Sequence, residues 1–340
     1  NFHDPKLIHY LAAVKIQTQI FQTFTIVAFA IIASGSVIAQ DWMDDEDWGP
    51  VRKGFEFGLN FGVYQATHDP AQLYGGYTAG GSSLDNYFSL GNNQVELLSI
   101  PGYFERFYTQ AQNVQNALNW SSPIEVYSYP FQMRYNPSMM FGLKGTLFFN
   151  PENAIVFGVD AVSLRASGGY SLVNQNNVGN INQALEYGVF ANERRYFTSI
   201  GYRTSLYISD YASWIIGLGA CATTVEIVSN SFNVENMEFQ LITPIGPVVG
   251  GNPSNPNGNT RNLSNTGFGF YGLFGLEGMF EEGGNLEANF RVSRDRIKLG
   301  RAEDTGEPGS TGYDRVNWNF ALYITWMIPP HIGDFVRASF

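Results

Sequence analysis

The sequence predicts an all-β protein, an eight-stranded antiparallel transmembrane β-barrel. Eight segments alternate between apolar residues and small or polar ones, as strands do because successive side chains point to opposite faces. The connections between these segments alternate between long and short. Composition agrees: glycine is abundant at 37 residues, and charged residues make up only 14% of the 340, well below the roughly 25% usual in soluble domains.

The first and last of the eight segments show the alternation most clearly. In 53–64, KGFEFGLNFGVY, apolar residues share one parity, while the glycines, Glu56 and Asn60 share the other. In 316–328, seven apolar residues form one unbroken face. The other predicted strands cover 138–149, 154–166, 196–208, 213–226, 267–280 and a segment around Leu286 to Val292. A tilted strand crosses the hydrocarbon layer with about 9–11 residues.

The order of the connections decides between a soluble sandwich and a membrane barrel. Short turns are predicted at 150–153, 209–212 and 281–284. Long loops are predicted at 65–137, 167–195, 227–266 and 299–315. Outer-membrane barrels have short periplasmic turns and long extracellular loops. We therefore place the apolar faces against lipid and the protein in the cell outer membrane.

Aromatic residues near both ends of the predicted strands fit the two interfacial belts expected of a bilayer-spanning barrel. Those near the short turns are Phe149, Trp214, Phe280 and Trp326, and Trp318 lies near the opposite rim. Their distribution agrees with the orientation that the loops indicate.

The opposite parity of the strands places charged residues inside the barrel. They are Glu56, Lys144, Asp160, Arg203, Glu277, Glu287 and Arg291. Buried charges should pair, because unpaired ones are costly. Strand order predicts one group from Glu277, Glu287 and Arg291, and a second from Lys144 and Asp160. An eight-stranded barrel is only wide enough for side chains to fill, so a plug of ion pairs is favoured over a gated or charge-selective pore.

The chain ends carry the predicted targeting segments. Residues 1–39 are interpreted as an N-terminal extension plus a signal peptide, with a short apolar run, 24–33, and Ala39 at the cleavage position. Because the extension is unusual ahead of a signal, the reading frame is expected to start further downstream. Residues 40–52 would form an acidic periplasmic linker, 53–328 the barrel, and 329–340 a C-terminal tail.

The first loop is 73 residues long and contains a predicted short helix. Apolar residues recur there at three- and four-residue steps, namely Phe104, Phe107, Ala111, Val114 and Leu118. Pro101 stands just ahead of the run, a suitable place near a helix start. We expect the helix to lie over the barrel mouth or against the third loop, and favour burial of its apolar stripe over presentation to a partner.

Charge and motifs narrow the possible chemistry. The net charge of −11 disfavours nucleic acid as a partner. The sequence has no zinc-type cluster, phosphate-binding glycine loop or haem motif, so no cofactor or metal is predicted. Cys221 is interpreted as a small apolar filler. His68 and Asp69 follow the first strand, but a His/Asp pair without an identifiable nucleophile is a weak sign of catalysis, and we predict no enzyme activity.

The eight alternating strands, the order of turns and loops, and the final aromatic Phe340 resemble the small OmpA/OmpX/OmpW-type barrels of Gram-negative outer membranes. The Ala-Gln end of the signal and the Asn/Tyr/Gly-rich loops are similar to outer-membrane β-barrel proteins of Bacteroidetes. The resemblance implies contact with outer-membrane lipid and lipopolysaccharide, and recognition of the last strand by the barrel-assembly machinery. Here a tail, 329–340, separates that strand from Phe340.

Three function hypotheses follow. The leading one is a structural or surface-interaction protein whose long loops meet an extracellular ligand or protein. The alternative is a narrow, porin-like channel for small or hydrophobic solutes, motivated by the lumenal charges and glycines. The third is an outer-membrane lipid-modifying hydrolase, motivated by His68 and Asp69 alone.

Overall fold

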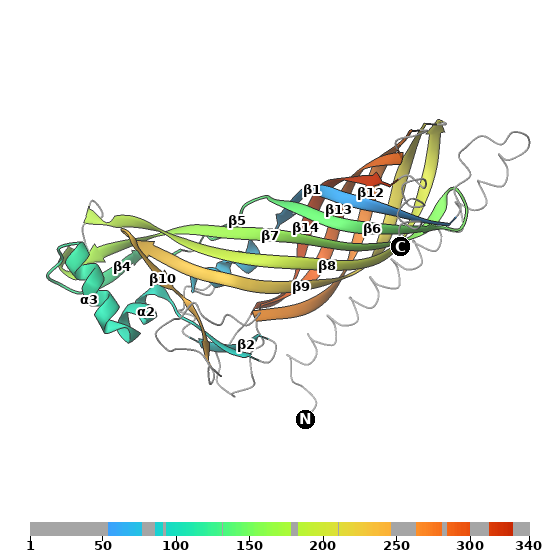
Figure 1. Cartoon of the computed structure of the whole chain (residues 1–340). Coiled ribbons are helices and arrows are strands. Elements are labelled where there is room, and N and C mark those ends of the chain that lie inside the picture. Colours follow the sequence, from blue (N-terminus) through green and yellow to red (C-terminus); the bar gives the residue numbers. More distant parts are fainter. Residues whose placement is uncertain are drawn as a thin grey trace, which may run out of the picture. The chain divides into compact units, whose positions relative to one another are not determined.

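The computed structural model describes residues 54–76, 86–90, 93–130, 132–177, 183–209, 211–245, 263–280, 284–299 and 313–328. Strands dominate these ranges, and eight of them form a closed antiparallel ring (Figure 1). The predicted signal peptide, acidic linker and C-terminal tail lie outside the described residues.

The ring confirms the predicted fold class. Its strands are β1 (Gly54–Ala66), β6 (Ser138–Phe148), β7 (Asn153–Asn174), β8 (Leu185–Ser209), β9 (Ala212–Val234), β12 (Leu263–Phe280), β13 (Gly284–Leu299) and β14 (Tyr313–Met327). Each strand pairs with the next one in this order. The first and last strands also pair, with Phe61 opposite Ile324, and this pairing closes the ring. We call the end with the short turns the turn end, and the other the loop end.

The long connections contain further elements. Between β1 and β6 lie η1 (Asp69–Gly75), β2 (Asn86–Leu90), β3 (Asn93–Leu97), α2 (Ile100–Arg106), α3 (Tyr108–Ala117), β4 (Ile124–Ser128) and β5 (Arg134–Tyr135). A short η2 (Gln175–Asn177) follows β7, and β10 (Met237–Gln240) and β11 (Ile242–Ile245) follow β9. β2, β3 and β11 form a separate three-stranded sheet. None of the described helices has the length and hydropathy needed to cross a membrane.

The outer face of the ring is a belt of exposed apolar side chains. It includes Phe57, Leu143, Ile200, Phe274, Phe290 and Leu322, one from each of several strands. A contiguous apolar surface of this extent is unusual on a soluble monomer, whereas a lipid-facing barrel wall requires it. The alternation in the sequence therefore has the predicted orientation, with apolar side chains outside and small or polar ones inside.

Three ring strands are longer than predicted. β7, β8 and β9 have 22, 25 and 23 residues. The prediction of a long loop at 167–195 is wrong, because most of this segment belongs to paired strands. Ser167 lies opposite Phe190, and the pairing continues to Leu172 opposite Leu185. Beyond the apolar belt the outward positions become polar, with Arg165 and Arg194 exposed. The apolar alternation that marks a lipid-facing strand stops there, although the backbone pairing continues. The predicted loop at 227–266 is likewise shortened by β9.

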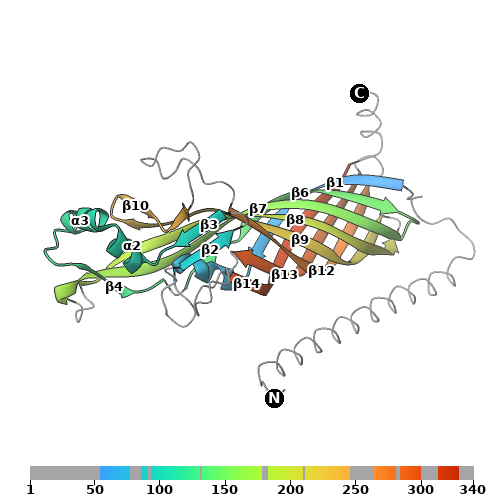
Figure 2. The same ribbon diagram turned by 90° about the horizontal axis from the view of Figure 1, so that it is seen from below.

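The extended parts of these three strands support a substructure that we call the platform: 163–174 of β7, 185–194 of β8, 226–234 of β9, and β4, β10, α2 and α3. Figures 1 and 2 show the helices at the far end of the long strands from the ring. The core of the platform surrounds Phe232, which is fully buried. The ring centroid of Phe232 lies 5.3 Å from that of Tyr103 and 5.1 Å from that of Phe239. Aromatic packing therefore fixes α2 against β9 and β10.

The predicted single helix of the first loop is two helices in the structure. Phe107, between α2 and α3, has φ −107° and ψ 68°, outside the helical region, and its ring lies 4.6 Å from that of Tyr103. The break keeps this side chain on the apolar side. Phe104 and Val114 are buried, and the remaining residues of the predicted stripe, Phe107, Ala111 and Leu118, pack half-buried against the same core.

Candidate functional site

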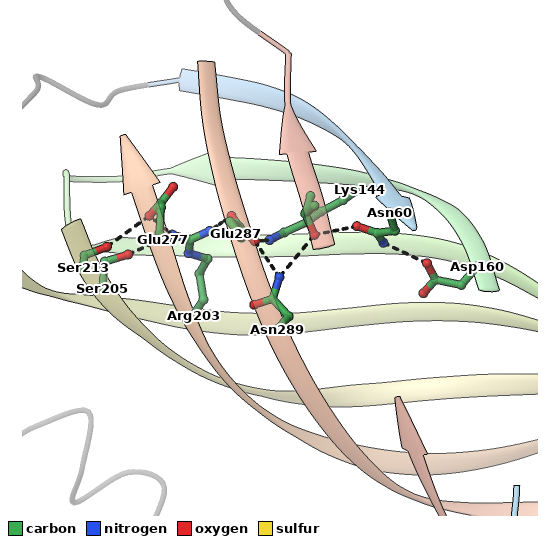
Figure 3. A network of polar contacts seen from close by, with 10 residues as sticks. Asn60, Lys144, Asp160, Arg203, Ser205, Ser213, Glu277, Glu287 and Asn289 are labelled. Carbon is green, nitrogen blue, oxygen red and sulfur yellow. Dashed lines mark hydrogen bonds and ion pairs between the residues drawn. The ribbon is translucent and has the colours of Figure 1, made fainter. Parts of the chain in front are cut away.

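A network of polar side chains crosses the barrel interior (Figure 3). At its centre is Arg203 of β8. Its guanidinium nitrogens lie 2.9 Å from a carboxylate oxygen of Glu277 and 2.5 Å from one of Glu287. Both carboxylates are fully buried. Arg203 also donates to Ser205 Oγ at 2.9 Å, and Ser213 Oγ donates to Glu277 at 3.2 Å, so β8, β9, β12 and β13 are tied together through one guanidinium.

Glu287 connects this centre to the opposite wall. It forms a second ion pair, with Lys144 of β6, a strand that is separated from β13 by β14 and β1 in the ring. Asn289 donates its side-chain amide to Glu287 at 2.9 Å and to Thr325 Oγ1 at 3.2 Å. One buried carboxylate thus accepts from three side chains, which offsets the cost of removing its charge from water.

The network continues toward the loop end. Thr325 donates to Asn60 Oδ1 at 2.8 Å, and Asn60 donates to Asp160 Oδ1 at 2.8 Å. The other oxygen of Asp160 lies 3.6 Å from the Arg291 guanidinium. That guanidinium also lies 4.2 Å from the ring centroid of Tyr271. Ion pairs, amides and a cation–π contact therefore form one connected group.

The seven charged residues predicted for the lumen all lie on the inward parity of their strands; Glu56 is half-buried near the turn end and the others are buried. The predicted pairs differ from the observed ones. Glu277 and Glu287 meet Arg203, and Arg291 meets Asp160 instead. The prediction considered hairpin neighbours only, whereas long side chains reach across so narrow a barrel.

Little free volume remains between these side chains. A cavity of about 30 Å³ is lined by Lys144, Asp160, Tyr271 and Arg291, among others. A second cavity beside Tyr64 measures about 10 Å³. A water molecule needs roughly 10–15 Å³ of such volume. The first cavity therefore has room for one or two waters, and the interior at this height is filled mainly by protein.

A second polar group, the mouth cluster, lies at the loop end and was missed by the sequence prediction. It consists of Tyr64, Tyr74, Tyr135, Glu193 and Arg195. One carboxylate oxygen of Glu193 accepts hydrogen bonds from the hydroxyls of Tyr74, at 2.6 Å, and Tyr135, at 2.5 Å. Its other oxygen pairs with Arg195, which also donates to Tyr64 at 3.2 Å. Glu193 and Arg195 continue the inward parity of Ser199 and Arg203, a signal that extending the predicted strand would have revealed.

The mouth cluster holds η1 in the barrel mouth. Pro70 stands at the start of this short helix, and Gly76, with φ 73°, ends it. The helix contacts β5, β7, β8 and β14, and Asn230 donates to the Tyr74 carbonyl at 3.1 Å. Burial, and then the nearby Glu193 carboxylate, raise the pKa of Tyr74 well above its usual range. The hydroxyl is therefore a neutral donor, as its contact with Glu193 requires.

Two residues considered for chemistry have structural contacts. His68 Nδ1 accepts from the backbone N–H of Tyr135 at 3.2 Å, and Asp69 lies 3.7 Å from exposed Arg315. Cys221 was expected to be an apolar filler, but its buried thiol lies 2.9 Å from Asp295 Oδ1. Among the described residues, no three metal-binding side chains converge.

The five predicted belt aromatics are exposed on the outer face: Phe149, Trp214, Phe280, Trp318 and Trp326. Trp214 stacks on Phe274 with 5.1 Å between ring centroids. Trp318 lies at the loop end, and its ring centroid is 5.7 Å from the guanidinium carbon of Arg294. Aromatic rings at both ends of a lipid-facing wall are typical of interfacial belts.

The closed ring, its apolar outer belt, and the short turns opposite long connections define a small outer-membrane β-barrel protein. No protein-family model matches the sequence, and no curated protein matches it.

The chain resembles solved structures of several other proteins. They include the outer membrane protein OprG from Pseudomonas aeruginosa, with 11% identity over 83% of this chain and 99% of that chain, TM-score 0.34. The outer membrane protease OmpT from Escherichia coli has 8% identity over 83% and 99%, TM-score 0.35. Ail, the attachment invasion locus protein of Yersinia pestis, solved with the heparin analogue sucrose octasulfate, has 10% identity over 82% and 100%, TM-score 0.30. At these values the likeness says nothing about ligands or activity.

Proposed function

We propose that this protein is a surface-interaction protein, in which a plugged barrel anchors a rigid extracellular platform. The observation that carries the proposal is the length of β7, β8 and β9, which reach 22 to 25 residues. Crossing the bilayer takes only about 9–11 residues of a tilted strand. Roughly half of each long strand is therefore left to build structure beyond the membrane.

The platform has the properties of a binding surface. Its aromatic core around Phe232 is buried, so its outer positions are held by packed strands and helices. Tyrosines stand among those positions, with Tyr108 69% and Tyr127 39% exposed, and tyrosine is enriched in protein interfaces. A surface that is already ordered loses less conformational entropy on binding. An extracellular protein or ligand is the proposed partner.

Cysteine labelling on intact cells tests the placement of the platform. Tyr127→Cys on β4 should react with a membrane-impermeant maleimide, because we place β4 outside the cell. The matched control is Tyr211→Cys, which is 62% exposed in the turn between β8 and β9. It should react only after the outer membrane is permeabilised. The native Cys221 is buried and gives a low background. Labelling of Tyr211→Cys in intact cells, with protection of Tyr127→Cys, would contradict the proposal.

Conductance in planar bilayers tests the plug. The polar network around Arg203 leaves room for only a few waters, so we expect no steady ohmic openings from the reconstituted protein. Bilayers that receive protein-free vesicles provide the baseline. Steady openings that change in size in Arg203→Ala or Lys144→Ala would instead support the channel hypothesis, because both side chains line the cavity in the middle of the polar network.

A further inference from the structure

The outer face of β13 changes abruptly from apolar to basic. Leu286 and Phe290 are exposed at its turn end and middle. Towards the loop end the same parity carries Arg294 and Arg296, both exposed, and the half-exposed Lys298. Alternate residues of a strand point the same way. These three residues, the β13 basic stripe, therefore form a row of about 13 Å on the outside of the barrel.

Aromatic side chains flank the β13 basic stripe. Arg294 pairs in register with Phe270 of β12 on one side and Trp318 of β14 on the other. Phe270 is 59% and Trp318 53% exposed, and the Arg294 guanidinium carbon lies 5.7 Å from the Trp318 ring centroid. Val316, opposite Arg296, is also exposed. The basic side chains therefore follow directly after the lipid-facing aromatic rings, at the loop-end edge of the exposed apolar face.

The row of cations is particular to β13 among the described ring strands. On β8 the outward sequence from the belt is Tyr196, Arg194 and Asn192, and on β9 it reaches Glu226. Arg315 at the start of β14 adds a further exposed cation, which is paired with Asp69 of η1 at 3.7 Å. Asp314 lies opposite Lys298 in the strand register. The other residues that the strand register places opposite the stripe are Phe270 and Trp318, beside Arg294, and Val316, beside Arg296. All three side chains are apolar.

We propose that the β13 basic stripe binds the phosphorylated headgroup of an outer-leaflet glycolipid, whose acyl chains lie along Phe270, Phe290 and Trp318. Arginine suits phosphate because its planar fork donates two parallel hydrogen bonds. Basic residues beside a membrane attract anionic headgroups. A soluble polyanion would use the cations but not the adjoining rings. A lipid uses both, with charge above and hydrocarbon below, so the structure favours a lipid as the occupant.

Lipid binding to the full chain in detergent, followed by native mass spectrometry, tests the site. The probes are bisphosphorylated lipid A, the same lipid with its phosphates removed, and inorganic phosphate. The wild type should prefer the phosphorylated lipid, and Arg294→Gln/Arg296→Gln/Lys298→Gln should weaken that binding by about tenfold or more. The matched control, Arg165→Gln/Arg194→Gln, removes exposed arginines of β7 and β8 and should stay within about twofold.

A charge-conserving variant separates the role of the cations from that of the fold. Arg294→Lys/Arg296→Lys should weaken binding by about threefold, less than the glutamine variant does, because lysine keeps the charge but lacks the planar fork. Far-UV circular dichroism verifies that each variant is folded. If the triple variant does not fold, the single variants Arg296→Gln and Lys298→Gln should each show a partial loss. Equal binding of the dephosphorylated lipid, unchanged binding by the glutamine variants, or saturation by inorganic phosphate at the same concentration as lipid would overturn the proposal.

Discussion

Replacing Arg203 with alanine should lower the free energy of unfolding by about 3–5 kcal/mol. Its guanidinium is the shared partner of two fully buried carboxylates, Glu277 and Glu287. The loss of this cation therefore removes an ion-pair partner from both acids, inside a barrel where the cavity beside Arg203 holds only one or two waters. Denaturant unfolding of the reconstituted protein, followed by tryptophan fluorescence, measures the effect.

A matched variant and a double-mutant cycle make this measurement specific. Arg194→Ala removes an exposed arginine from the outer face of the same strand, and should change the free energy by no more than about 0.5 kcal/mol. Arg203→Ala/Glu287→Gln should be less destabilised than the sum of the single variants, with a coupling of about 0.5–3 kcal/mol. Equal stabilities of the Arg203 and Arg194 variants would show that the network does not support the fold.

Replacing Glu193 with alanine should release η1 from the barrel mouth and lower the free energy of unfolding by about 3–5 kcal/mol. The change leaves the fully buried Arg195 without its ion-pair partner. It also removes the acceptor of two tyrosine hydroxyls that enter from η1 and β5. Hydrogen–deuterium exchange of peptides covering 69–75 reports the release, and should become faster in the variant.

The tyrosine variants give a graded control for the mouth cluster. Tyr74→Phe and Tyr135→Phe each delete one hydrogen bond to a charged acceptor, worth about 1.5–3 kcal/mol, and should speed exchange less than Glu193→Ala does. Burial raises the pKa of Tyr74 above its unfolded value. Its stabilising contribution is therefore complete below about pH 10 and is lost only as pH rises through the folded pKa. Unchanged exchange at 69–75 in all three variants would disprove the role of the cluster.

The barrel was predictable because lipid imposes a strict rule on the sequence. A wall between lipid and a packed lumen needs an apolar residue at every second position, as in the runs through Phe57 and Leu322, and a polar or small residue between them. The tight turns at one end are also visible in the sequence. The eight strands and the inward parity of Arg203 and Glu287 follow from these local patterns.

The remaining features depend on contacts that local patterns do not encode. Lys144 and Glu287 meet across the lumen from strands separated by two others, so hairpin adjacency gave the wrong pairs. The sequence prediction ended β7, β8 and β9 too early. Outside the lipid, an outward strand position can hold an exposed Arg165 or Arg194 as readily as a leucine, so the apolar alternation is lost there. Glu193 and Arg195 fell within the resulting loop. The lipid-facing strands of the barrel can therefore be predicted from the sequence, whereas the platform and the mouth cluster can be recognised only once the tertiary fold is known.

The seam between β1 and β14 sets the order in which the protein can assemble. Phe61 and Ile324 face each other there, although they belong to the first and the last of the described strands. In contrast, β7, β8 and β9 are successive hairpins whose contacts are local, and closing a short loop costs less entropy than closing a long one. Until β14 arrives, β1 and β13 each keep an open edge, and unpaired backbone groups in hydrocarbon cost several kcal/mol each. Stable insertion consequently waits for the final strand, by which time the outward-reaching hairpins can already be formed.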